Sequence, residues 1–521
     1  MKKTILYFLF LIFLPFIVRS QINPKRYYGI RPELIRGPYL QVATPTSIIV
    51  RWRTDELDVS FVRYGKQEGK FDGLAGNGSR THEHIVTLTN LEPYTKYYYL
   101  IEGFKDTLQW DESNHFTTLP PAGAENKYRI GVFGDCGTNS TIQHNVRDQF
   151  LKKLGSNPLN AWILVGDNAY SFGKDVEYQS NFFNVYKDFL LKQSPLYPAP
   201  GNHDYQDLPM LAEVAQRSGE VAYYQNFTMP TRGEAGGVSS NSSAFYSFDI
   251  DNIHFLSLDS QGEEDYGTRL FDTTGSQVKW IKKDLEANKG KEWIIAYWHH
   301  PPYSMGSHNS DSETQMVKIR QNFIPILERY GVDLVICGHS HSYERSKLMK
   351  GHYGPEASFS TEIHLLSNSS GAYDGSANSC PFVKDSSNRG TVYIVTGSSG
   401  RVDYSQSTFP HNALPFSNVT IGGATLLEIE GNRIDMKWIC ADGVIRDQFT
   451  LMKNVNKRST ITVKRGQSVE LKASFVGQYR WEGSNKTTRS ITIKPRPGTS
   501  VYKVKDPSNC IEDVFTVNVS K

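Results

Sequence analysis

Residues 162–170 read W-I-L-V-G-D-N-A-Y, an apolar run followed at once by Asp167 and, three positions later, Tyr170. A short apolar run of this kind favours a buried strand. Carboxylate and phenolate oxygens are donors that suit hard metal ions. In layered α/β domains functional groups gather at the carboxyl ends of the strands. The segment therefore predicts such a domain with a ligand site at the end of this strand.

Four further segments repeat the arrangement, each with a metal-ligand residue type just after an apolar run. They are G-D-C-G, G-N-H-D, W-H-H-P-P-Y and G-H-S-H, which supply Asp135, Asn202, His299, His339 and His341. Two adjacent cations need oxygen donors, imidazoles and one carboxylate that can bridge them, and the combined set supplies all three. The five segments together predict a site for two metal ions.

The order and spacing of these segments resemble the calcineurin-like metallophosphoesterase superfamily. Tyr170, three residues after Asp167, narrows the resemblance to the purple acid phosphatases, and S-Y-E-R after G-H-S-H also fits. The resemblance runs from about Arg36 to Lys453 and implies two sites that share Asp167. The ferric site would hold Asp135, Asp167, Tyr170 and His341, and the divalent site would hold Asp167, Asn202, His299 and His339. The implied cofactors are Fe(III) and a second divalent ion, which would be Fe, Zn or Mn.

The activity implied by the resemblance is that of an acid phosphatase acting on small-molecule phosphate monoesters. In this reading two cations clamp the phosphate while a hydroxide attacks phosphorus. The same site could instead cleave phosphodiesters or nucleotide pyrophosphates, because loops set the substrate class. A function of a different class is a surface-binding protein with a vestigial phosphatase core. The complete set of seven ligand residues argues against that reading.

Two histidines outside the ligand set are candidates for catalysis, His203 beside Asn202 and His308 nine residues after His299. In the family, histidines at both positions contact the substrate phosphate or act as the general acid. From the residues alone, His203 could instead hold Asn202, and His308 could be a solvated loop residue. Asn309 stands where plant-type members often carry another histidine, so the details of proton transfer do not carry over.

The pair His299-His300 offers two imidazoles, of which we assign His299 as the ligand. The family pattern is H-x-P, and neighbouring side chains of an extended segment point to opposite faces. His254 lies inside the apolar run 253–258 and is expected to be a core histidine.

The N-terminus has the pattern of a signal peptide. Lys2 and Lys3 precede an apolar run, and V-R-S at 18–20 offers a cleavage site after Ser20. The alternative is a membrane anchor, but the run is shorter than the roughly 20 residues that a span needs. We expect residues 1–20 to be removed, no stable membrane span afterwards, and a secreted, periplasmic or cell-surface protein.

The net charge limits the kinds of partner that we expect, and the number of cysteines limits the possible disulfide bonds. Without Lys2, Lys3 and Arg19 the chain has 54 basic and 54 acidic residues, so we expect no nucleic-acid partner. Five cysteines are an odd number, which leaves at least one unpaired within the chain. Cys136 and Cys337 adjoin the predicted site strands and are expected to be buried and unpaired.

The expected fold class is multidomain, with an N-terminal β-sandwich, a central α/β layered metallophosphoesterase domain and a small C-terminal β module. Residues 36–119 show short strand runs separated by turn residues such as 73–78, as in a fibronectin-like sandwich. Residues 120–453 alternate strands with helix-period segments at 141–154 and 277–285. Within them, 352–390 is expected to be a surface loop near the site. Residues 454–521 resemble the immunoglobulin-like modules of bacterial exported proteins.

Overall fold

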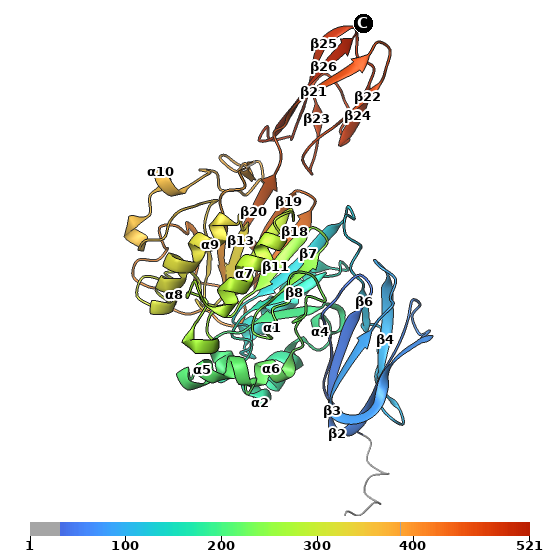
Figure 1. Cartoon of the computed structure of the whole chain (residues 1–521), viewed down its shortest axis with the longest axis vertical. Coiled ribbons are helices and arrows are strands. Elements are labelled where there is room, and N and C mark those ends of the chain that lie inside the picture. The colour runs from blue at the N-terminus through green and yellow to red at the C-terminus, as the bar shows by residue number, and fades with distance from the viewer. Residues whose placement is uncertain (1–31, 386, 521) are drawn as a thin grey trace, which may run out of the picture.

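The computed structural model describes residues 32–385 and 387–520, and the expected signal peptide lies outside them. Three parts follow one another along the chain: an N-terminal sheet, a central α/β body, and a small β module that projects from the body (Figure 1). Within the described residues, no helix has both the length and the apolar character that a membrane crossing requires.

Six strands build the N-terminal sheet. They are β1 (Leu34–Gln41), β2 (Ile48–Gly65), β3 (Gly73–Leu88), β4 (Lys96–Glu102), β5 (Thr107–Gln109) and β6 (His115–Thr117). The long strand β2 pairs with β1 in its first part and with β4 in its last part, and its pairing with β3 shifts register around Asp58. This bent sheet encloses a core that includes the buried Trp52 and Tyr99.

The expectation of a turn at residues 73–78 is wrong, because this segment is the first part of β3 and pairs with β2. A side chain at Gly73 would meet the ring of Tyr64, and one at Gly76 would meet the carbonyl of Ser60. The glycines are therefore present because the neighbouring strand packs against them, rather than because the chain turns there.

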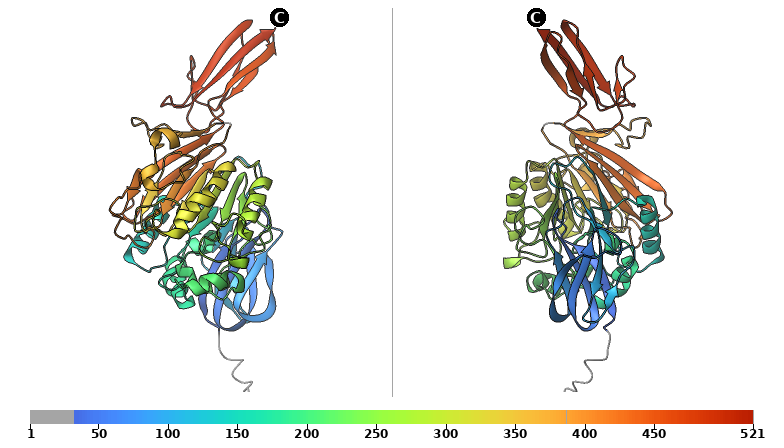
Figure 2. Two further views of the ribbon diagram at one scale, coloured as in Figure 1. Left: turned by 60° about the vertical axis from the view of Figure 1, so that its left-hand side comes forward. Right: turned by 90° about the vertical axis from the view of Figure 1, so that its right-hand side faces the viewer.

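The central body contains two seven-stranded sheets (Figure 2). The first has the order β10 (Tyr246–Ile250), β11 (Ile253–Ser257), β12 (Trp293–Trp298), β13 (Leu334–Cys337), β16 (Val392–Thr396), β14 (Tyr343–Arg345) and β17 (Phe416–Asn418). The second has the order β15 (Phe382–Lys384), β20 (Ile445–Lys453), β19 (Arg433–Cys440), β18 (Gly423–Glu430), β7 (Lys127–Phe133), β8 (Ala161–Val165) and β9 (Leu196–Ala199).

The two sheets pack face to face. Tyr197 of β9 stacks on Phe248 of β10, and Tyr343 of β14 stacks on Trp438 of β19. Alternation along β12 directs Tyr297 into this shared interior, while Trp298 points to the opposite face, under helices. The body is thus layered as helix, sheet, sheet and helix.

Helices cover the outer faces of the two sheets. α1 (Thr141–Leu154) packs on β18 and β19, and α7 (Ser276–Ala287) with α9 (Ile324–Arg329) covers the first sheet. The remaining α-helices are short: α2 (Asp175–Glu177), α3 (Asn184–Tyr186), α4 (Leu190–Gln193), α5 (Pro209–Ser218), α6 (Ala222–Asn226), α8 (Thr314–Lys318) and α10 (Thr361–His364). The two predicted helical segments correspond to α1 and α7.

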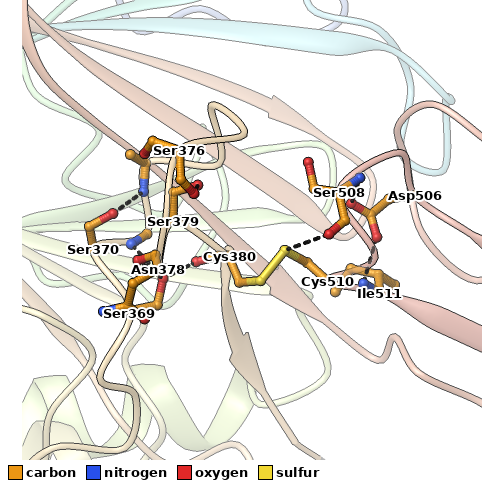
Figure 3. Close-up of a disulfide and its surroundings, with 12 residues drawn as sticks. Ser369, Ser370, Ser376, Asn378, Ser379, Cys380, Asp506, Ser508, Cys510 and Ile511 are labelled. Atoms are coloured by element: carbon orange, nitrogen blue, oxygen red, sulfur yellow. Dashed lines mark hydrogen bonds between the residues drawn. A yellow bond between two sulfur atoms is a disulfide. The ribbon is translucent and has the colours of Figure 1, made fainter.

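The segment 352–390 differs from the expected surface loop near the site. It buries His352 and His364, and its strand β15 pairs with β20. Cys380 within it forms a disulfide with Cys510 of the C-terminal module (Figure 3). The second half of the segment therefore belongs to the junction with that module.

Six strands form the C-terminal module: β21 (Arg458–Lys464), β22 (Val469–Lys472), β23 (Arg480–Trp481), β24 (Ser490–Ile493), β25 (Gly498–Lys505) and β26 (Glu512–Ser520). Four of them make the sheet β21-β26-β25-β23, and β22 pairs with β24. Trp481 and Phe515 centre its small core, and Met452 at the end of β20 packs into the same core.

Candidate metal centre

Parallel strands end at one edge of the body and bring the predicted ligands together there. Asp135 and Asp167 lie two residues beyond β7 and β8, and His299 follows directly after β12. Asn202 follows β9, and His339 follows β13. All nine predicted site residues, the seven ligands with His203 and His308, lie at this edge, which we call the metal edge.

The first donor group consists of Asp135, Asp167, Tyr170 and His341. The hydroxyl of Tyr170 lies 3.0 Å from Asp135 Oδ1, 2.9 Å from Asp167 Oδ2 and 3.0 Å from His341 Nε2. A phenol has one proton to donate, so it cannot satisfy all three neighbours at once. A cation among these atoms would use all four as ligands.

The second donor group consists of Asp167, Asn202, His299 and His339. His299 Nε2 lies 3.0 Å from Asn202 Oδ1, 3.3 Å from Asp167 Oδ2 and 3.3 Å from His339 Nδ1. Asp167 Oδ2 is therefore common to both groups. Among the described residues, Asp135, Asp167 and His299 also satisfy the spacing expected of ligands to one metal ion.

Each ligand histidine is oriented through its other ring nitrogen. His299 Nδ1 lies 2.9 Å from the carbonyl oxygen of Val165, His341 Nδ1 lies 2.6 Å from Asp403 Oδ2, and His339 Nε2 lies 3.2 Å from Glu313 Oε2. In a neutral ring, which is the form that binds a metal ion, an acceptor at one nitrogen places the proton there and leaves a lone pair on the other. The three lone pairs consequently converge on the two donor groups, which is the arrangement that metal binding requires.

The protonation properties of these groups fit a site built around positive charge. Burial alone would lower the pKa of His299, but the Asp167 carboxylate outweighs it and raises the pKa to about 9. Burial and the neighbouring histidines lower the pKa of His339 to about 3, so this ring is neutral. Burial and the carboxylates of Asp135 and Asp167 raise the pKa of Tyr170 well above its ordinary value. A phenolate at Tyr170 therefore requires a cation beside it.

Three of the predicted ligands have an unusual backbone conformation. Asp135, Asp167 and His339 have φ values of 54°, 52° and 67°, in the left-handed region that non-glycine residues rarely adopt. Strain of this kind persists where the surrounding structure holds it, and it gathers at functional sites. Three of the predicted ligands thus share a backbone conformation that the surrounding structure must hold in place.

The glycines of the motifs make room for the ligands. A side chain at Gly201 would come within 2.2 Å of Asp167 Oδ1. At Gly166, where φ is 92°, it would come within 2.4 Å of His299 Nδ1. Each glycine lets a ligand from a neighbouring strand end approach the backbone closely.

A pocket of about 530 Å³ opens over the metal edge. Its lining consists of Asp167, Asn202, His203, Asp207, Gln261, His300, His308, Glu313, Thr314, Gln315, His339 and His341. Every one of these residues has a polar or ionisable side chain, as expected for a site that receives a charged substrate. His308 and His203 are partly exposed, with side-chain exposures of 32% and 24%, and so are accessible from the pocket.

The two candidate catalytic histidines are each fixed at Nδ1. His203 Nδ1 lies 2.6 Å from the carbonyl oxygen of Ser171, and its Nε2 lies 3.8 Å from Asp167 Oδ2. His308 Nδ1 lies 2.9 Å from Glu313 Oε1, and its ring packs on His339. In both residues the acceptor at Nδ1 leaves Nε2 as the nitrogen that can act in the pocket.

The sequence led us to expect that His300 points away from His299 and from the site, but His300 also lines the pocket. β12 ends at Trp298, so the alternation of an extended strand no longer applies to the next two residues. His300 is buried, its Nδ1 lies 2.8 Å from the hydroxyl of Ser260, and its ring packs against His339.

The prediction that His254 is a core histidine is confirmed, because it is buried between Asp249 and Asp284.

Several residues that shape the site had no sequence signal. Glu313 and Asp403 each hold a ligand histidine, and Asp207 Oδ1 accepts a hydrogen bond from the amide of Asn202. Asp204 accepts hydrogen bonds from the backbone N–H groups of Gly201 and Asn168. Asp204 closes the G-N-H-D segment without having been assigned a role, and Glu313, Asp403 and Asp207 lie outside the five segments, so three-dimensional neighbours identify all four.

Comparison with known families agrees with this geometry. Residues 128–343 match the family described as calcineurin-like phosphoesterase, and residues 35–118 match the family described as purple acid phosphatase, N-terminal domain. The first matched region covers the part of the central body that holds all nine predicted site residues, and the second covers the N-terminal sheet.

Similar proteins carry related names. Purple acid phosphatase 23 of Arabidopsis thaliana is 29% identical over 366 residues, which covers 59% of this chain and 73% of that protein. Acid phosphatase type 7 of Mus musculus is 26% identical over 416 residues, covering 75% and 83%. The structure of a purple acid phosphatase from yellow lupin seeds superposes with a TM-score of 0.61 at 19% identity, covering 81% and 74%, and confirms the fold.

Proposed function

We propose that this chain hydrolyses phosphate monoesters at the metal edge. The premise is that it belongs among the purple acid phosphatases, because it joins their N-terminal domain to a calcineurin-like phosphoesterase domain. The observation that carries the proposal is the shared carboxylate of Asp167. Its Oδ2 lies within 3.3 Å of both Tyr170 and His299, so one residue joins the two donor groups.

The two donor groups differ in the charge they offer, which supports two different cations. Asp135, Asp167 and the phenolate that Tyr170 would form beside a cation give the first group anionic oxygens, which suit Fe(III). Asn202 gives the second group a neutral amide oxygen beside two imidazoles, which suits a divalent ion such as Fe, Zn or Mn. When bound, the pair supplies Lewis acidity to the phosphate oxygens and an activated nucleophile.

The residues above the ligands perform the remaining tasks. His203 and His308 present Nε2 to the pocket from fixed rings, one near Asp167 and one over His339. A protonated imidazole in either place binds a phosphate oxygen, and the one nearer the ester oxygen donates the proton that the leaving alkoxide needs. We assign the proton donor to His308, because Glu313 accepts a hydrogen bond from its Nδ1 and so holds the ring with Nε2 free for the substrate.

We also propose that the protein is exported. The support is the charged and apolar pattern of residues 1–20 together with the cleavage sequence after Ser20. Sequencing of the N-terminus of protein collected outside the cytoplasm tests this proposal, and a mature protein that still begins at Met1 contradicts it.

The function is tested with purified protein and a chromogenic phosphate monoester, with and without a chelator. Metal content is measured on the same samples, and a matched diester is assayed in parallel. We expect monoester hydrolysis that the chelator removes and that added metal restores. A metal-loaded protein that hydrolyses only the diester would assign the site to phosphodiesters, and one with no hydrolysis would overturn the proposal.

A further inference from the structure

The charges of this chain are distributed unevenly, although the whole chain is nearly neutral. Residues 454–521 contain 13 lysines and arginines but only 5 acidic residues, whereas residues 1–453 contain 44 basic and 49 acidic residues. The C-terminal module is therefore strongly basic and is attached to a body with an acidic excess. Such asymmetry between parts of a chain points to a polyanionic partner for the basic part.

Within the module, cationic side chains gather at the end that lies far from the body. Lys464 pairs with Ser520 at the end of β26, and Gly498 pairs with Val519 beside it. Two segments meet at this end. Lys464 ends β21 and Arg465 follows it, while Lys494 and Arg496 lie in the connection between β24 and β25. We call these four residues the distal tip. Figure 1 shows this end, marked by the C-terminus, pointing away from the body.

Among the described residues, no carboxylate forms an ion pair with the four cations of the distal tip. All four are exposed, and within the described part of the chain no ion pair involves any of them. The acidic residues of the module lie mainly at the near end, where Glu512 begins β26 and pairs with Lys505. The tip therefore carries four exposed positive charges that are available to a ligand, whereas cations of the near end such as Lys505 lie beside carboxylates.

The distal tip and the metal edge face opposite ways. β20 leads into the module, and it runs in the same direction as β18 and opposite to β7. Asp135 follows the carboxyl end of β7, so the module joins the body at the edge away from the ligands. From that junction, β21 extends by about 20 Å to the distal tip at 3.3 Å per residue. A surface bound at the tip leaves the pocket open to solvent.

We propose that the distal tip binds an acidic polysaccharide and holds the body with its metal edge turned outward. Residues 464–468 read K-R-G-Q-S and residues 494–498 read K-P-R-P-G, so the cations stand among glycine, proline and polar residues. They contain no aromatic side chain to stack on a nucleobase and no large aliphatic side chain to enter a bilayer. Carboxylate or sulfate groups along a hydrated polysaccharide match exposed cations of this kind.

The test uses the full-length protein and immobilised alginate, a carboxylated polysaccharide, with neutral dextran as the reference. The tip variant carries Lys464→Gln, Arg465→Gln, Lys494→Gln and Arg496→Gln. The matched control removes four exposed cations from the body by Lys152→Gln, Lys153→Gln, Lys279→Gln and Lys283→Gln. We expect the wild type and the control to bind alginate in a salt-dependent way, and the tip variant to bind at least about tenfold more weakly at low salt.

A gain-of-charge variant makes the test independent of any loss of folding. Glu470 is an exposed acidic residue on β22, and Glu470→Lys should raise the salt concentration needed for release. Equal loss of binding in the tip variant and the control, or no change in Glu470→Lys, would overturn the proposal. Binding of the wild type to anionic vesicles or duplex DNA without binding to alginate would overturn the polysaccharide assignment.

Discussion

The hydroxyl of Tyr170 contacts three other candidate ligands and can donate a proton to only one of them. We therefore expect a phenolate bound to Fe(III), which would give the oxidised protein a purple or pink colour. Tyr170→Phe should abolish the colour while the remaining ligands still hold metal. Visible absorption and iron content are measured together on iron-supplemented protein. A wild type that is iron-loaded, oxidised and colourless would rule out the tyrosinate.

Glu313 acts on the reaction through two histidines at once, since its two carboxylate oxygens contact His308 and His339. Glu313→Gln leaves one acceptor for two N–H donors, so one ring loses its orientation. Changes to groups that orient metal ligands typically cost about 10–100-fold, and we expect kcat to fall within that range. Glu286→Gln, on the exposed face of α7, serves as the control.

The substrate dependence of Glu313→Gln separates positioning from general damage. Alkyl esters need a proton on their leaving group more than aryl esters with good leaving groups do. If Glu313 positions His308 as the acid, the alkyl ester loses more rate than the aryl ester, as it should in His308→Ala. Equal losses on both esters would assign Glu313 to the metal ligand His339 alone.

His254 illustrates a titratable residue that contributes to stability rather than to the site. Burial alone would lower its pKa, but the carboxylates of Asp249 and Asp284, both 2.7 Å away, raise it above the ordinary value of 6.5. Because the folded pKa is raised, this stabilisation is complete below pH 6.5 and is lost as the pH rises through the folded pKa. The loss of melting temperature in His254→Gln should thus be larger at pH 5.5 than at pH 9. A loss independent of pH would show that the imidazolium contributes nothing.

At the scale of the element, the strand ends position the ligands, and the glycines beside them allow the close approach. Gly201→Ala should leave β9 in place but displace Asp167, whose Oδ1 would lie 2.2 Å from the new Cβ. We expect this variant to remain folded, with reduced metal content and at least about a hundredfold lower kcat, since a small misplacement at a reacting centre has an effect of this size. Gly290→Ala, where the Cβ meets nothing within 4 Å, should be neutral. Full activity in Gly201→Ala would mean that Asp167 tolerates displacement.

The elements that the sequence predicted are those whose signal is local. The helix α1 was predicted with its bounds because Ile142, Val146, Phe150 and Leu154 recur at helical spacing. The ligands could be listed because each follows an apolar run in its own segment. The fold around them then required only that parallel strands end at a common edge.

What the sequence did not predict depends on contacts between distant segments. Glu313 and His339 are 26 residues apart, and Asp403 is 62 residues from His341. Residues 73–78 were misread because glycine is favoured both in turns and where a neighbouring strand packs closely. The disulfide between Cys380 and Cys510 spans 130 residues, and no spacing rule connects them. Cys136 and Cys337 are free and buried as expected.

At the scale of the whole molecule, the module is held to the body by more than one peptide connection. A disulfide joins Cys380 of the body to Cys510 of the module (Figure 3). Asn432 of the body donates a hydrogen bond to the carbonyl of Ser474, and Tyr373 packs against the module's core. These contacts fix the direction in which the distal tip points relative to the metal edge.

Removal of the module separates its structural role from catalysis. Truncation after Lys453 leaves every candidate ligand in place but exposes Met452, which is now buried in the module's core. We expect kcat and KM for a monoester close to those of the wild type, with a lower melting temperature. Cys380→Ser combined with Cys510→Ser keeps the module but removes the cross-link, and loss of a native disulfide typically costs about 2–5 kcal/mol. This double variant should also keep its activity, while limited proteolysis near residues 454–457 becomes faster. A truncated protein that is folded and metal-loaded but inactive would show that the module, at the opposite edge from the ligands, nevertheless supports the site.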